Sequence, residues 1–116
     1  MSDLIDRYLA AWNATDEDDR RTAIENAFTT DVSYVDPLAD VRGRDQLEAT
    51  IAAVQGQFPG FVFTLLGEPD SHHDVTRFRW GLGPAGQEPL VEGSDVATVD
   101  GARISSITGF LDKVPG

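Results

Sequence analysis

The spacing of apolar residues changes once along this chain, near residue 60. Before that point they recur every three to four residues, as in amphipathic helices, and after it every second residue, as in half-buried strands. Helices that precede a run of strands, rather than alternate with them, are typical of α+β proteins with a mainly antiparallel sheet. The sequence therefore predicts an α+β fold in which helices pack on one face of a curved sheet.

Each predicted element follows from this pattern and from local breaking residues. Three helices are expected. The first covers residues 2–13, the second covers residues 16–28, and the third starts from the loop at 41–45 and ends near residue 58. A capping hydroxyl and acidic residues at 15–19 indicate the start of the second helix. A short strand is expected at 31–36, and four further strands at 61–66, 75–82, 90–99 and 103–111. Turns are expected at 83–86 and at Asp100-Gly101.

Composition narrows the class of protein. A chain of 116 residues matches one domain, which we expect to span residues 1–116. The net charge of −11 disfavours nucleic acid and anionic membranes as partners. The chain contains no Cys, which excludes disulfides and Cys-based zinc sites. Because neither a signal peptide nor a membrane-spanning run is recognisable, the simplest expectation is a soluble cytoplasmic protein.

Asp36 ends the short predicted strand. Tyr34 and Val35 favour β-structure, and Pro37 cannot donate a hydrogen bond to a neighbouring strand, so pairing should stop at Asp36. A carboxylate at a strand end beside a rigid turn is held in place without being part of the packing. The alternative is that Asp36 only begins a turn, as Asp-Pro pairs often do.

Asp95 lies in an apolar row. In the strand at 90–99 it shares its face with Val91, Gly93, Ala97 and Val99. Burying an ionised, unpaired carboxylate costs several kcal/mol, roughly, so such a group is usually paired, hydrogen-bonded or protonated. The alternative is an edge-strand Asp that caps a bulge near Gly93. The small neighbours leave room above the sheet, which indicates a pocket.

The strand at 75–82 predicts which face of the sheet is covered. Phe78 and Trp80 alternate with Arg77 and Arg79, so the aromatic face should be buried and the basic face exposed. Tyr8 lies on the apolar stripe of the first helix and would face Asp36 and Asp95 across the pocket. The candidate walls are Trp12, Phe28, Phe58, Phe78 and Trp80.

Four stretches resemble one known superfamily. They are the run RYLAAWN at 7–13, Val35-Asp36-Pro37, Gly93-Ser94-Asp95 and Gly109-Phe110-Leu111. Together they resemble the nuclear transport factor 2-like (NTF2-like) superfamily, and within it the SnoaL-like polyketide cyclases and ketosteroid isomerase. The resemblance covers almost the whole chain in element order. It implies a cone-shaped, mainly antiparallel sheet, wrapped by three N-terminal helices around an apolar cavity, the cystatin-like/NTF2-like fold.

The resemblance also implies roles for three residues. Ketosteroid isomerase uses an Asp general base beside an oxyanion hole made of a Tyr and a protonated Asp. By resemblance, Asp36 is the base and Tyr8 and Asp95 are the donors. This implies cofactor-independent proton transfer alpha to a carbonyl, as isomerase or aldol-type cyclase, on an apolar polycyclic or polyketide-like ligand. Desolvation should raise the pKa of Asp95 and keep it largely protonated near neutral pH.

Several alternatives bear on this activity. Epoxide hydrolases of the superfamily carry Arg where this chain has Gly93, which counts against that activity. Dehydratase members use paired histidines, but His72 and His73 lie in a segment, 69–74, that is typical of a solvated turn. Adjacent histidines on a strand point to opposite faces, so no metal site is expected.

Two further interpretations concern ligand binding and assembly rather than catalysis. In one, the protein is a non-catalytic NTF2-like module that holds a ligand or a partner, and Asp36 and Asp95 are merely structural. The other concerns assembly, since superfamily members are often dimers through the outer sheet face. That face includes Arg77, Glu92 and Ser105 here, and we expect a homodimer.

Overall fold

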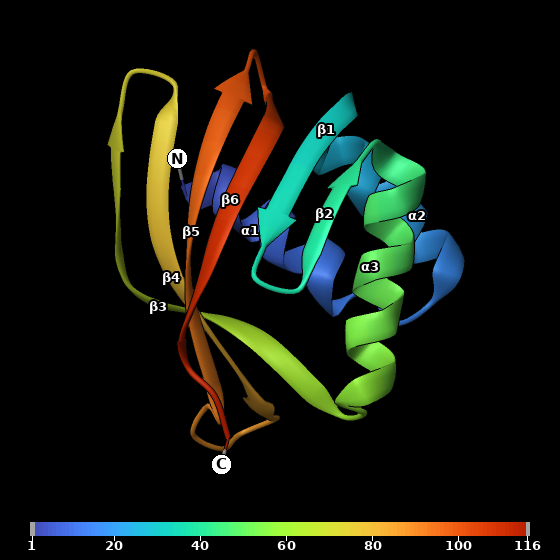
Figure 1. Cartoon of the computed structure of the whole chain (residues 1–116), viewed down its shortest axis with the longest axis vertical. Helices are drawn as coiled ribbons and strands as arrows, with labels where there is room; N and C mark the ends of the chain where they lie inside the picture. Colours follow the sequence, from blue (N-terminus) through green and yellow to red (C-terminus); the bar gives the residue numbers. More distant parts are fainter. Residues whose placement is uncertain (1, 116) are drawn as a thin grey trace.

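The computed structural model of the chain describes residues 2–115; the predicted domain also includes residues 1 and 116, which lie outside them. Helices precede most of the strands, as predicted (Figure 1). The helices are α1 (Ser2–Asn13), α2 (Glu17–Ala27) and α3 (Arg44–Gln57). The strands are β1 (Phe28–Asp36), β2 (Ala39–Arg42), β3 (Phe61–His72), β4 (Val75–Pro84), β5 (Val91–Asp100) and β6 (Arg103–Lys113).

The strands form one six-stranded sheet in the order β2-β1-β6-β5-β4-β3. Every neighbouring pair is antiparallel except β1 and β6, which are parallel. The sheet twists strongly, and the helices cover one of its faces (Figure 1). This confirms the predicted α+β fold with a curved, mainly antiparallel sheet.

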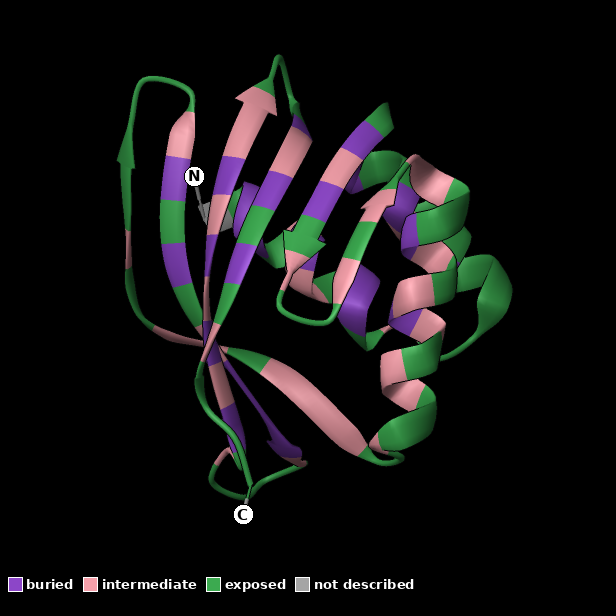
Figure 2. Ribbon diagram, viewed as in Figure 1, coloured by how far each residue is buried: buried purple, intermediate pink, exposed green. Residues whose placement is uncertain are grey.

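Buried residues alternate with more exposed ones along much of β4, β5 and β6 (Figure 2). In β4, Phe78 is buried while Arg77 and Arg79 are exposed and form ion pairs with Asp70 and Glu92. The predicted register of this strand is therefore confirmed, because a shift by one residue would have exchanged the two faces.

The start of the sheet differs from the prediction. β1 begins at Phe28 rather than at residue 31, and it ends at Asp36 as expected. β2 was not predicted, because four residues are too few to show a period of two. It pairs with β1 so that Asp36 faces Ala39 across a tight turn. α2 is capped by the side chain of Asp16, which accepts a hydrogen bond from the backbone of Asp19, and not by a hydroxyl.

β3 is longer than predicted. It continues to His72 after a break in register between Leu66 and Asp70, where Gly67 has a φ of +70°. The turn to β4 is thereby reduced to His73 and Asp74. Both histidines are exposed, as expected for a solvated hairpin, and within residues 2–115 no cluster of three metal-binding side chains occurs.

The helices dock on the sheet through apolar stripes and a few polar contacts. Ile5 of α1, Ile24 of α2 and Leu47 of α3 are almost completely buried, and burial of each such side chain contributes about 1.5–3 kcal/mol. The Asn13 amide bonds to both the N–H and the C=O of Phe63, which ties α1 to β3. In the part of the chain described, no helix is long and apolar enough to cross a membrane.

Candidate active site

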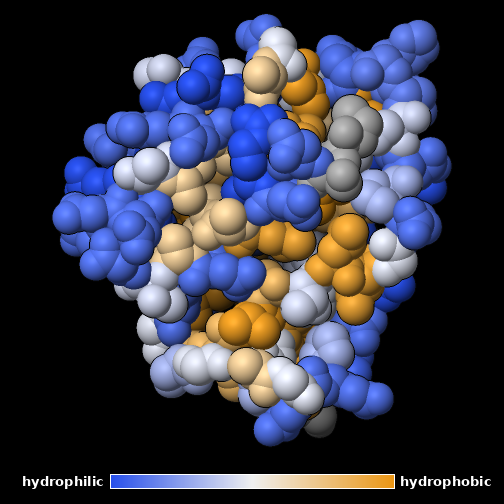
Figure 3. All heavy atoms as spheres, turned by 180° about the vertical axis from the view of Figure 1, so that it is seen from behind, coloured by the Kyte–Doolittle hydropathy of each residue, from blue (hydrophilic) through white to orange (hydrophobic). Residues whose placement is uncertain are grey.

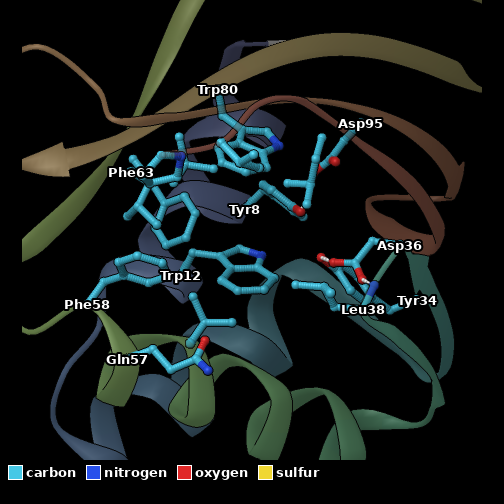
Figure 4. Close-up of a pocket in the computed structure, with 16 residues that line it drawn as sticks. Tyr8, Trp12, Tyr34, Asp36, Leu38, Gln57, Phe58, Phe63, Trp80 and Asp95 are labelled. Carbon is cyan, nitrogen blue, oxygen red and sulfur yellow. Dashed lines mark hydrogen bonds between the residues drawn. The ribbon is translucent and has the colours of Figure 1, made fainter.

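A cavity of about 160 Å³ lies between α1, α3 and the concave face of the sheet (Figure 4). One side of it is aromatic and the other carries two Tyr–Asp pairs (Figure 4). From behind, apolar atoms are visible in a hollow framed by hydrophilic side chains (Figure 3). The cavity is lined by Tyr8, Trp12, Tyr34, Asp36, Leu38, Val54, Gln57, Phe58, Phe63, Trp80, Leu82, Val91, Asp95, Leu111, Val114 and Pro115.

Asp95 and Tyr8 form a buried pair. Tyr8 Oη, on α1, donates a hydrogen bond of 2.5 Å to Asp95 Oδ2, on β5. Only 2% of Asp95 and 3% of Tyr8 is exposed. Burial raises the pKa of Asp95 to about 6. The hydrogen bond from Tyr8 and the nearby Trp80 indole oppose this rise, and the charge of Asp36 assists it. Burial and the charge of Asp95 also raise the pKa of Tyr8 well above its usual value, so Tyr8 remains a donor.

The pKa of Asp95 is raised, as the sequence predicted, but by less than the prediction required. A pKa of about 6 means that the ionised form predominates at pH 7 in the free protein. The expectation of a largely protonated Asp95 near neutral pH is therefore corrected. The physical reason is the hydrogen bond from Tyr8, which stabilises the carboxylate and offsets part of the desolvation.

Asp36 has a different environment at the end of β1. Tyr34 Oη donates to Asp36 Oδ2 at 2.6 Å, and the backbone N–H groups of Leu38 and Ala39 donate to Oδ1 at 2.8 Å each. The carboxylate is half-buried and lines the cavity. In residues 2–115 it makes no ion pair, and the Arg44 guanidinium binds backbone carbonyls instead. Asp36 is thus oriented by neutral donors and stays accessible from the cavity.

Gly109 of β6 lies between the two carboxylates. It pairs with Asp95 of β5, and the preceding residue, Thr108, pairs with Val35 of β1. A Cβ atom on Gly109 would lie 2.7 Å from Asp95 Oδ1 and 3.3 Å from the Cβ of Asp36. The missing side chain therefore allows both carboxylates to reach the same cavity from β1 and β5, the strands on either side of β6.

Of the predicted walls, Trp12, Phe58 and Trp80 line the cavity, whereas Phe28 and Phe78 do not. The last two pack edge-on against the far side of the Tyr8 ring, at centroid distances of 5.8 and 5.2 Å. Strand parity gives the face on which a residue lies, but it does not tell whether a helix covers that position. Their assignment as ligand-binding residues is therefore corrected, and they instead support Tyr8 from behind.

Sequence reasoning missed other parts of the site. Tyr34 shares the face of Asp36, since the two are two residues apart in β1, and this parity would have identified it. Phe63 contacts both Trp12 and Trp80, at centroid distances of 5.1 and 5.4 Å. The room expected above Gly93 is occupied by the Trp80 indole, which a Cβ atom on Gly93 would overlap.

A curved sheet with three helices on one face, closed around an apolar cavity, defines the NTF2-like class of α+β proteins. The SnoaL-like domain family matches residues 5–107, and the chain belongs to this family. No functionally curated protein shows a significant sequence match to the chain.

Solved structures agree with this assignment. A candidate isomerase of the SnoaL-like family from Agrobacterium tumefaciens is 38% identical, with 96% of each chain covered and a TM-score of 0.90. A candidate polyketide cyclase from Sinorhizobium meliloti is 19% identical, with 94% of each chain covered and a TM-score of 0.73. A candidate ketosteroid isomerase from Kribbella flavida is 16% identical over 97% of this chain and 78% of its own, with a TM-score of 0.69. The last two show likeness of fold alone.

Proposed function

We propose that this SnoaL-like protein is a small, cofactor-independent enzyme that moves a proton at a carbon next to a carbonyl group, as an isomerase or an aldol-type cyclase. The observation that supports this most strongly is that Asp36 and the Tyr8–Asp95 pair face one apolar cavity. They come from three separate segments of the chain, β1, α1 and β5. A base and hydrogen-bond donors around an apolar cavity are what enolate chemistry requires.

In the proposed reaction, an Asp36 carboxylate oxygen accepts the proton from the α-carbon. The C–H electron pair enters the carbonyl system, and negative charge develops on the substrate oxygen. When Asp95 is protonated, the Tyr8 hydroxyl turns from Asp95 to the substrate, and both groups donate hydrogen bonds to that oxygen. In an isomerase, the Asp36 acid returns the proton to the γ-carbon. In a cyclase, the enolate carbon attacks a second carbonyl group of the same substrate, the π bond of that carbonyl breaks, and the resulting alkoxide takes the proton from the Asp36 acid.

The cavity volume bears on the substrate. Its volume of about 160 Å³ is close to the roughly 150 Å³ of an engineered cavity that takes up benzene. The enclosed part of an apolar substrate is therefore about one six-membered ring. Further rings of a polycyclic or polyketide-like ligand would lie at the mouth, near the exposed side chains of Leu38 and Val114.

A non-catalytic ligand-binding module is the second candidate. It is favoured by the three hydrogen bonds that Asp36 accepts, because they satisfy its carboxylate as part of the turn from β1 to β2. In that case the cavity binds an apolar ligand and no proton is transferred.

Proton transfer itself separates the two candidates. Cyclohex-3-enone and related β,γ-unsaturated ketones are incubated with the protein in D₂O, with α-deuteration followed by NMR and conjugation followed by ultraviolet absorbance. The enzyme proposal expects saturable exchange well above the rate with free aspartate at the same pH. Saturable binding of these ketones with exchange no faster than in buffer would establish the binding module instead.

A further inference from the structure

The indole N–H of Trp12 is buried in the cavity wall without a satisfactory acceptor. Trp12 is 4% exposed, and among the residues described its Nε1 has no hydrogen-bond partner. Buried donors in folded proteins are nearly always paired, and an unpaired one is costly, so each calls for an explanation. A ligand that accepts a hydrogen bond at this position would provide one.

Trp12 and Tyr8 are placed to act together. They lie four residues apart on α1, so both face the cavity, and their rings are 6.4 Å apart and tilted by 49°. In Figure 4 the indole nitrogen is turned toward the polar side of the cavity, where the Tyr8 hydroxyl lies. The N–H is close enough to act against the rise in the pKa of Tyr8, but the geometry of a hydrogen bond is not met. The two donors thus approach one region of the cavity.

The two Tyr hydroxyls that line the cavity already have acceptors. The Tyr8 hydroxyl donates to Asp95 and the Tyr34 hydroxyl donates to Asp36. The Trp80 indole lies close enough to Asp95 to lower the pKa of that carboxyl, and its Nε1 is not among the buried atoms without a partner in the described residues. Among the described residues, Trp12 therefore carries the buried donor of the cavity lining that has no partner, and a ligand can accept from it without breaking an existing hydrogen bond.

We propose that Trp12 is a ligand-binding residue whose Nε1–H donates a hydrogen bond to the oxygen of a monocyclic ketone or enol held in the cavity beside Tyr8. The inference rests on the proposed function, because it adds a third donor, beside Tyr8 and Asp95, to the substrate oxygen on which charge develops. The ring of the ligand packs against Phe63 and Trp80, which continue the aromatic wall from Trp12. As the ring becomes an enolate, this hydrogen bond strengthens, since donors to charged oxygens bind more tightly.

The test compares two ligands of nearly the same shape. Cyclohex-2-enone has an oxygen that only accepts, and 1-methylcyclohexene has no polar atom. We expect Trp12→Phe to weaken binding of the enone roughly five- to tenfold, as expected for loss of one hydrogen bond, and to change binding of the hydrocarbon by less than about twofold. Phe63→Leu is the matched control, because it removes an aromatic wall without a donor and should weaken both ligands alike.

The proposed hydrogen bond should also change the NMR signal of the Trp12 indole N–H. The chain has two Trp residues, so loss of one indole N–H resonance in Trp12→Phe assigns the signal in ¹H–¹⁵N spectra. That signal should move downfield on addition of the enone and not on addition of the hydrocarbon. Equal weakening of both ligands by Trp12→Phe, no downfield shift, or no measurable binding of the enone to the unmodified protein would each overturn the assignment.

The outcomes also separate this inference from the proposed enzyme activity. Enone binding through Trp12 without α-proton exchange leaves the donor assignment standing and removes the activity. Exchange at an unchanged rate in Trp12→Phe, together with unchanged enone affinity, removes the donor assignment and leaves the activity standing.

Discussion

Asp36 and Asp95 face the same cavity on either side of Gly109, yet they are positioned in opposite ways. Asp36 lies at the end of β1, and its hydrogen bonds come from residues two or three positions away in sequence. Asp95 lies in the middle of β5, and its partner Tyr8 is 87 residues distant. One carboxylate is thus oriented by a turn and the other by the packing of a helix on the sheet. The comparison shows how one side-chain type acquires two environments within a single site.

Asp36→Asn should have the largest effect. An amide cannot accept the α-proton, so we expect the exchange rate to fall by about 10²- to 10⁴-fold. The fold should be kept, because the amide oxygen still accepts from the turn N–H groups. The rate is measured by NMR in D₂O, with Asp40→Asn as control, an exposed carboxylate of the same hairpin. Retention of most of the activity would make Asp36 a turn residue only.

Asp95→Asn should act on stability through pH. The folded pKa of about 6 exceeds the ordinary value of 3.8, so the folded state binds the proton more tightly. The contribution of Asp95 to the free energy of unfolding is then highest below about pH 4, falls by about 3 kcal/mol as pH rises to just above 6, and is constant at higher pH. Asp95→Asn should remove this slope, as measured by urea unfolding at pH 4.5 and 8.

The same substitution sharpens the assignment of roles. If protonated Asp95 is the donor, activity should decline as pH rises through about 6, and Asp95→Asn should lose that decline while keeping part of the activity. Asp100→Asn, an exposed carboxylate at the end of β5, is the control and should keep the slope. A carboxyl-carbon NMR titration of Asp95 with a midpoint at or below that of free Asp contradicts this prediction.

Gly109→Ala tests the space that separates the carboxylates. Its Cβ would lie 2.7 Å from Asp95 Oδ1, so that carboxylate would have to move. Overpacking of this kind costs about 1–3 kcal/mol, and a displacement near 1 Å can lower activity by about 10²-fold. Gly56→Ala in α3, which meets nothing within 4 Å, should instead stabilise the protein slightly. Unchanged activity in Gly109→Ala would show that Asp95 need not keep its position.

Arg79→Ala should have the smallest effect. Arg79 belongs to the same strand as Trp80 but points to the outer face, where it pairs with Glu92 at 2.9 Å. Because its side chain is 51% exposed, we expect a loss of about 0.2–1 kcal/mol, smaller still at high salt. Urea unfolding at two salt concentrations measures it. A loss above about 2 kcal/mol would mean that the outer face is buried in solution.

The features predicted from sequence depend on short-range rules. Pro37 ends β1 at Asp36 because proline lacks an N–H, and this holds whatever packs nearby. The burial of Phe78 and the exposure of Arg77 follow from the alternation of a strand. β2 was not predicted, because it forms by pairing with β1 and its own four residues show no strand pattern.

The sequence alone determined the order of the elements and the faces of the strands. It also singled out Asp36 at a strand end and Asp95 in an apolar row, because these features follow from backbone geometry and residue type. Tertiary structure alone decided which inward-facing aromatics reach the cavity. Phe28 and Phe78 pack against the Tyr8 ring and do not line the cavity, while Phe63 and Tyr34 pack against Trp12 and do line it. Tertiary structure also set the pKa of Asp95, because desolvation raises it and the hydrogen bond from Tyr8 lowers it. Both effects arise only when a helix and a strand far apart in sequence come together.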